Sequence, residues 1–162
     1  MNTSQFRAEG GCTCGNVRYA VNIKPLIVHC CHCRWCQRET GSAFVLNALI
    51  ENQYLQCTQG EVSVIKTPTL SGRGQKIARC PQCHVALWSH YSWNANILFL
   101  RVGTLDNPDL MPPDIHIYTQ SKQPWVILPE GALTKLKFYS VKSVWPEESL
   151  RRIAALKEQS SS

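Results

Sequence analysis

The chain has 162 residues, of which 44% are hydrophobic, so a single folded domain is expected rather than a disordered chain. Its 17 Lys and Arg residues exceed its 11 Asp and Glu residues, which gives a formal net charge of +6 without any dense basic block. A scattered charge of this size favours an ordinary solvated surface; it would help to attract an anionic small molecule, and it makes a nucleic-acid or protein interaction module the least favoured function.

Short strands separated by Gly and Pro turns are predicted through most of the chain, after a polar lead-in over residues 1–10. The predicted strands are 17–21, 43–50, 54–57, 62–66, 85–91 and 97–102, with shorter extended pieces at 115–118 and 125–128. The segments 29–42 and 68–74 are predicted as loops, the first dense in cysteine and the second rich in Pro, Ser and Gly. Residues 146–159 are predicted as a helix, because Pro begins the segment, acidic residues follow and apolar residues recur at helical spacing. The pattern indicates a mainly β fold of antiparallel strands with a short C-terminal helix.

The nine cysteines are the main chemical signal in the sequence. The chain has no run of about 18 apolar residues that would predict a transmembrane helix, and its first residues lack the apolar stretch of a signal peptide. The expected compartment is therefore the cytoplasm. In a reducing compartment, cysteines are metal ligands or reactive thiols more often than disulfides, and an odd number argues against complete pairing.

Two cysteine pairs, Cys12-x-Cys14 and Cys80-x-x-Cys83, each lie in a turn beside a predicted strand. Four thiolates from two such pairs suit a closed, tetrahedral zinc site, which would be structural because no ligand position stays open. The alternative is that these cysteines are small buried hydrophobic residues. We expect a structural zinc that ties the first strand to the middle of the sheet.

Three further cysteines, Cys31, Cys33 and Cys36, lie within six residues of one another. Three protein ligands leave the fourth position of a zinc ion open, as catalytic or substrate-binding sites require. Cys30 and His32 are possible additional ligands, although His32 is expected to face solvent or to stand behind the ligands. We predict a second, open zinc site here.

Cations near a site of three thiolates would offset its negative charge. Arg34 and Arg38 flank the cysteines and would either do so, hold a substrate carboxylate, or simply face solvent. Ser42 follows with a hydroxyl that is a further candidate for binding substrate. Cys57 stands alone in a predicted strand and is expected in the core. The tryptophans at positions 35, 88, 93 and 125 would either line a pocket or fill the core, and we expect the core.

Several motifs occur in an order that resembles a known family. They are Gly11-Cys12-x-Cys14-Gly15-x-Val17-Arg18-Tyr19, Cys31-His32-Cys33-x-x-Cys36, Gly41-Ser42-x-Phe44, Cys80-x-x-Cys83, Gly103-Thr104-Leu105-Asp106, and His116-Ile117-Tyr118 with Pro124-Trp125. Together they cover about residues 10–128, and the set is similar to the glutathione-dependent formaldehyde-activating family, which includes centromere protein V.

The resemblance implies stacked antiparallel sheets of the Mss4-like type and two zinc ions. One zinc would be structural and the other would lie at the substrate; their ligand sets would be Cys12, Cys14, Cys80 and Cys83 for the first, and Cys31, Cys33 and Cys36 for the second. It also implies a carbon–sulfur lyase reaction, written in reverse as the condensation of glutathione with formaldehyde to S-hydroxymethylglutathione. The second zinc would then position or activate the thiol.

The chain departs from the family pattern at two positions. His84 stands where family members commonly have Gly after the last zinc cysteine, so a left-handed turn there would be strained or altered. Cys30 beside Cys31 is an addition. The expected division is one zinc-binding domain over 1–140 and a helical tail over 141–162.

Three functions remain open at this point. The first is a zinc-dependent lyase-like enzyme acting on glutathione or a related thiol adduct. The second is a thiol-binding or carrier domain without turnover, and the third is the interaction module. The family is broad, and fold membership alone does not choose among them.

Overall fold

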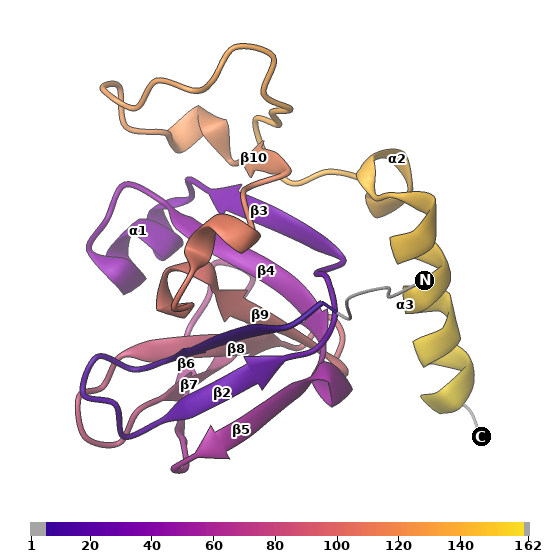
Figure 1. Cartoon of the computed structure of the whole chain (residues 1–162). Coiled ribbons are helices and arrows are strands. Elements are labelled where there is room, and N and C mark those ends of the chain that lie inside the picture. The colour runs from indigo at the N-terminus through magenta and orange to yellow at the C-terminus, as the bar shows by residue number, and fades with distance from the viewer. Residues whose placement is uncertain (1–5, 161–162) are drawn as a thin grey trace.

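The computed structural model describes residues 6–160 and is mainly β, with two sheets and a C-terminal helix (Figure 1), as the sequence predicts. A three-stranded sheet has the order β1-β2-β5, and a seven-stranded sheet has the order β10-β3-β4-β9-β8-β7-β6. The strands are β1 (Ala8–Gly11), β2 (Arg18–Val21), β3 (Ile27–Cys31), β4 (Val45–Glu51), β5 (Leu55–Gln59), β6 (Ser63–Thr67), β7 (Gln75–Arg79), β8 (Ala86–Tyr91), β9 (Ile97–Arg101) and β10 (Ile115–Ile117). Neighbouring strands pair antiparallel, except that β10 pairs parallel with β3.

Helices are few and short in the described part of the chain, apart from the last one. The α-helices are α1 (Arg34–Thr40), α2 (Val141–Val144) and α3 (Glu147–Ser160), and 3-10 turns occur at Asn52–Tyr54, Val102–Thr104, Pro108–Leu110 and Thr119–Ser121. None of the helices described is long and apolar enough to cross a membrane.

The main core lies between the two sheets. Val17, which precedes β2, and Tyr19 and Val21 of β2 pack with Val28, Ala48 and others of the large sheet. Because side chains alternate along a strand, the neighbours of these residues on β3 and β4 point to the opposite face of the large sheet. That opposite face carries a second core, which includes Ile27, Cys31, Cys36, Leu49 and Ile115 together with Trp145 and Leu156 from the C-terminal segment.

The C-terminal segment is held against the large sheet by polar contacts as well as by this second core. Ser149 Oγ donates to the carbonyl of Leu26 at 2.7 Å, and Arg152 forms a two-pronged ion pair with the buried carboxylate of Glu51. The predicted division at residue 140 stays a prediction.

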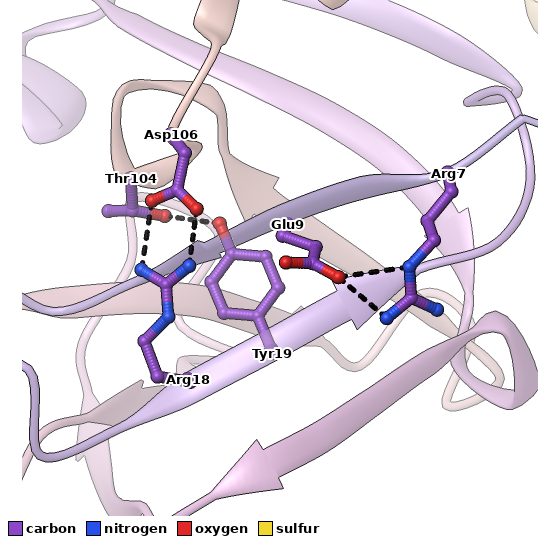
Figure 2. A network of polar contacts seen from close by, with 6 residues as sticks. All are labelled: Arg7, Glu9, Arg18, Tyr19, Thr104 and Asp106. Atoms are coloured by element: carbon purple, nitrogen blue, oxygen red, sulfur yellow. Dashed lines mark hydrogen bonds and ion pairs between the residues drawn. The ribbon is translucent and has the colours of Figure 1, made fainter.

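The Gly-Thr-Leu-Asp motif joins the 3-10 turn after β9 to the small sheet (Figure 2). The hydroxyl of Tyr19 and the Oγ1 of Thr104 are 2.7 Å apart, and Arg18 forms a two-pronged pair with Asp106. The Arg18 guanidinium lowers the pKa of Asp106. A Cβ on Gly10 would lie 2.5 Å from the Tyr19 hydroxyl, so the strand beside this network requires glycine. The motif therefore serves architecture in this fold.

Two sequence predictions about local structure are wrong. The segment 29–42 is not a loop: it completes β3 and then forms α1, in which the Cys33 sulfur caps the first turn and Gly41, at φ 64°, ends the helix. All five residues of β3 are buried, so the strand lacks the alternation that reveals a half-exposed strand. The piece at 125–128 is not a strand. In addition, β1 and β7 were not predicted, because each has few apolar residues.

Candidate metal and substrate site

The four cysteines of the two separated pairs come together between the small sheet and the turn before β8. The four sulfur atoms of Cys12, Cys14, Cys80 and Cys83 all lie within 4.8 Å of one another, with 3.5 Å between Cys12 and Cys14 and 3.7 Å between Cys14 and Cys80. Zinc–sulfur bonds of 2.3 Å in a tetrahedron place sulfur atoms about 3.8 Å apart. The spacing therefore fits a closed four-thiolate zinc site; we call this set the four-cysteine cluster.

The two loops that carry the four-cysteine cluster have matching backbones. The N–H of Cys12 donates to the carbonyl of Val17, and the N–H of Cys80 donates to that of Val85, each at 3.1 Å. The residue after the second cysteine of each pair is left-handed: Gly15 has φ 77° and His84 has φ 61°. His84 therefore adopts the left-handed backbone conformation that favours glycine, which is the strained turn expected at this position. Backbone N–H groups also point at the sulfurs, from Val17 to Cys12 at 3.2 Å and from Gln82 to Cys80 at 3.4 Å.

The second set of thiols, Cys31, Cys33 and Cys36, forms the three-cysteine cluster at the junction of β3 and α1. Its sulfur atoms also lie within 4.8 Å of one another, and two of the residues are buried while Cys33 is partly exposed. Cys33 accepts from the N–H of Cys36 at 3.3 Å as the N-cap of α1, which sets the position of its sulfur. Three converging thiols with one exposed member are suited to a zinc ion whose fourth position faces a substrate.

The crowding of the three-cysteine cluster separates the pKa values of its thiols. Hydrogen bonds from the thiols of Cys31 and Cys36 lower the pKa of Cys33 to about 3, although burial opposes this. The same contacts with Cys33 and Cys36, and then burial, raise the pKa of Cys31. Like charges this close disfavour each other, so three thiolates can coexist at neutral pH only with a bound cation. The donor set therefore fits a metal ion.

Arg101 of β9 is a cation near this cluster that sequence reasoning missed. Its side chain is 6% exposed, and no ion pair joins it to a carboxylate among residues 6–160. It donates instead to neutral oxygens of Asn47 and Ser89. Hydrogen bonding to Cys31 lowers the pKa of Cys36, but the Cys33 sulfur and burial raise it to about 12 overall, and Arg101 acts in the lowering direction. A lone buried arginine gives no signal in the sequence.

The predicted substrate residues line one cavity of about 590 Å³ beside α1. Arg34, Arg38 and Ser42 lie in its wall, together with Gln37, Gly41, Ala43, Gln123 and Trp125. Arg34 and Arg38 are one helical turn apart and so share a face of α1. The lining of the cavity thus offers two guanidinium groups, a hydroxyl and an indole. Trp125 is 69% exposed and Trp93 is 47% exposed, so their predicted place in the core is wrong, whereas Trp88 is buried.

Gln37 connects this cavity to the three-cysteine cluster. Its side-chain amide donates to the carbonyl of His32, between Cys31 and Cys33, at 2.8 Å, and to the carbonyl of Ser121 at 3.0 Å. Its oxygen accepts from Arg34 at 3.0 Å and from Gln123 at 3.1 Å. A buried residue with four such contacts fixes the cavity wall relative to the thiols. In the sequence, only the position of Gln37 next to Cys36 pointed to a role near the site.

Two remaining cysteine and histidine predictions need correction. Cys57 lies in β5 as predicted, but it is exposed rather than in the core: it pairs with the buried Tyr19, yet β5 is the edge strand of the small sheet and most of its residues are exposed. His32 is 0% exposed, so it does not face solvent. Its Nε2 lies 3.5 Å from the sulfur of Cys30 and 3.1 Å from Nδ1 of His116. Burial is the main cause that lowers the pKa of both histidines, that of His32 to about 4, so both rings are neutral at neutral pH.

Comparison with known proteins adds two observations. The sequence model of the family described as glutathione-dependent formaldehyde-activating enzyme matches residues 7–121. The crystal structure of a protein from Rhodobacter sphaeroides is similar to the chain, with a TM-score of 0.47 and 19% sequence identity over 65% of this chain and 96% of that one. A search of curated protein sequences gives no significant match.

Proposed function

Because the chain belongs to the glutathione-dependent formaldehyde-activating enzyme family, we propose that it is a zinc-dependent carbon–sulfur lyase acting on a thiol adduct of the S-hydroxymethylglutathione type. The observation that carries the proposal is the three-cysteine cluster: three sulfurs within 4.8 Å, one of them partly exposed, joined through Gln37 to a cavity lined by two arginines.

The reaction joins a thiol to an aldehyde. The sulfur of glutathione supplies the electron pair for a new carbon–sulfur bond to formaldehyde, the carbonyl π bond breaks, and the carbonyl oxygen takes up the proton that the thiol released. The lyase direction reverses each step. The barrier depends on having the sulfur as a thiolate and on holding it in line with the aldehyde carbon.

Cys31, Cys33 and Cys36 would hold the zinc ion in this scheme. A bound zinc would lower the pKa of a thiol at its open position and so supply a nucleophile at neutral pH. The protein contributes the geometry: β3 fixes Cys31, the N-terminus of α1 fixes Cys33 and the first turn of α1 fixes Cys36. Arg101, which is buried and forms no ion pair with a carboxylate of the described residues 6–160, would offset part of the charge of the thiolates.

The cavity would bind the rest of the glutathione molecule. Glutathione carries two carboxylates, and guanidinium groups bind carboxylates through paired, charge-assisted hydrogen bonds. We assign this role to Arg34 and Arg38, with Ser42 as a neutral donor and Trp125 as the apolar wall. Gln37 positions Arg34 through the hydrogen bond to its guanidinium. Holding both ends of the tripeptide would orient its thiol toward the three-cysteine cluster.

The four-cysteine cluster has a separate role in this proposal. Its zinc would be structural, because four protein thiolates leave no open position. It would join the turn before β2 to the turn before β8, and therefore the small sheet to the large one.

The test is to measure the rate at which formaldehyde and glutathione combine, by exchange NMR, with zinc-loaded protein at catalytic concentration. The native chain is expected to accelerate condensation above the uncatalysed rate, and Cys33→Ser is expected to abolish the acceleration while retaining the fold. Cys57→Ser is the matched control, because Cys57 is exposed and belongs to neither cluster. Glutathione binding without acceleration would indicate a carrier domain instead of an enzyme. The absence of both binding and acceleration at millimolar glutathione would overturn the proposal.

A further inference from the structure

A third group of ligand atoms lies on the opposite face of the large sheet from the three-cysteine cluster. Cys30 and His116 are register partners in the parallel pair of β3 and β10, and His32 follows β3 directly. Successive residues of a strand point to opposite faces, so Cys30 points away from the side that Cys31 occupies. We propose that Cys30, His32 and His116 form a third metal site, which binds Zn²⁺ or Cu⁺.

The distances fit a metal ion at the centre of the group. The Cys30 sulfur lies 3.5 Å from His32 Nε2, and His32 Nε2 lies 3.1 Å from His116 Nδ1, with all three atoms within 4.8 Å of one another. Tetrahedral zinc with bonds of 2.3 Å to sulfur and 2.05 Å to nitrogen places S and N about 3.6 Å apart and two N atoms about 3.3 Å apart. One thiolate and two imidazoles are a donor set that suits zinc and monovalent copper.

A hydrogen-bonded cluster alone explains the arrangement less well. A neutral imidazole nitrogen either donates or accepts, yet His32 Nε2 faces both the Cys30 sulfur and His116 Nδ1 at contact distance. One metal ion would instead receive a lone pair from each of the three atoms, and the thiol proton of Cys30 would be released to solvent.

The backbone holds these ligands in place. Cys30 and His116 lie within paired strands, and the N–H of His32 donates to the carbonyl of Ile117 at 3.0 Å. The His32 carbonyl accepts from Gln37 and from Ser121. Cys30 and His32 are 2% and 0% exposed, and His116 is 8% exposed. A metal ion would therefore enter the site past His116. Nδ1 of His32 has no hydrogen-bond partner among residues 6–160, so this site is expected to bind more weakly than the all-thiolate sites and to fill last.

The experiment counts metal ions per chain after titration with Zn²⁺, and in a second arm with Cu⁺ under reducing conditions, followed by removal of unbound metal. The native chain is expected to hold one ion more than His116→Gln and one more than Cys30→Ser, whereas Cys33→Ser should lose a different ion, so that His116→Gln with Cys33→Ser loses two. His90→Gln is the control, since His90 is a partly buried histidine bonded to Asn52 and outside the three groups.

Cobalt loading gives a second readout that does not depend on stoichiometry. His116→Cys should keep the ion and add a thiolate-to-cobalt absorption band, which separates loss of a ligand from loss of the fold. Equal metal content in the native chain, His116→Gln and Cys30→Ser in both arms would overturn the proposal. Because Cys33→Ser and the condensation assay report on the three-cysteine cluster, failure of either leaves this result unaffected.

Discussion

The two thiolate clusters use the same ligand in opposite surroundings. The four-cysteine cluster is assembled from two turns, and Cys14 and Cys80 in them are 66 residues apart in the sequence. One turn precedes β2 of the small sheet and the other precedes β8 of the large sheet. The three-cysteine cluster comes from one strand end and one helix start, beside a buried arginine and a cavity of about 590 Å³. The first can crosslink the fold but offers no position to a substrate; the second offers a position but closes no long loop. Ligand number and chain separation, rather than ligand type, therefore decide the role of a cysteine site.

The largest expected effect is the loss of the four-cysteine cluster. Cys80→Ser, or removal of metal from the native chain by a strong chelator, should abolish cooperative thermal unfolding measured by circular dichroism. Structural zinc contributes about 10–16 kcal/mol to the folding of zinc-finger peptides, which exceeds the stability of most domains. Retention of the native melting curve after Cys80→Ser would show that this cluster does not hold the sheets together.

The three-cysteine cluster should respond in the opposite way. Cys33→Ser is expected to lower the condensation rate by on the order of 100-fold or more, because even groups that only support metal ligands cost 10–100-fold. The melting temperature should change by only a few degrees, since Cys33 is partly exposed and closes no long loop. A collapse of the fold in Cys33→Ser would erase the distinction between the two clusters.

Arg101 provides a further test, because its charge acts in the lowering direction on the pKa of Cys36 in the three-cysteine cluster, although it also lines a pocket with Cys83 of the four-cysteine cluster. Arg101→Met should weaken the binding of zinc to the three-cysteine cluster by about 10–100-fold, because the thiolates lose a buried cation that offsets their charge. Competition with a chromogenic chelator measures this. The four-cysteine cluster should keep its ion. Unchanged zinc affinity of the three-cysteine cluster, relative to the native chain, would assign Arg101 a packing role.

A smaller effect is expected in the cavity. Arg38→Ala and Arg34→Ala should each raise the KM for glutathione about tenfold with kcat nearly unchanged, since an exposed charge-assisted contact contributes about 1–2 kcal/mol to binding. Arg73→Ala, in the exposed loop after β6, is the control. A fall in kcat with an unchanged KM would contradict a role in binding.

The smallest effect concerns the turn after Cys83. His84→Gly should raise the free energy of unfolding by about 0.5–1 kcal/mol, because a side chain at φ 61° is strained, partly offset by the greater freedom of glycine in the unfolded chain. Denaturant unfolding measures this, and the condensation rate should not change. Destabilisation instead would mean that the His84 side chain makes a contact worth more than the strain.

Local signals in the sequence were sufficient to predict how the cysteines group and to predict most strands, whereas the metal ions and the roles of the site residues stay predictions. Cys-x-x-Cys spacings predict metal ligands because a tight turn brings two sulfurs to one ion. Strain at position 84 was predicted because the chain has His where the family it resembles commonly has Gly, and His84 indeed has φ 61°. The segment 85–91 was predicted as a strand and forms β8, in which Leu87, Trp88 and Ser89 are all buried. The helix α1 was missed because cysteine density suggested a loop, although Gly41 marks its end.

By itself, then, the sequence determined which cysteines are paired by short spacing, the mainly β class and the C-terminal helix, since each depends on residues that are neighbours along the chain. Only the tertiary structure decided which side chains from distant parts of the chain lie near these cysteines. Arg101 of β9 acts on the pKa of Cys36 through its charge, and Trp125 lines the cavity from the segment after β10. His116 meets His32 from 84 residues away. No spacing rule encodes these contacts, because strand pairing and burial on a shared face place them together.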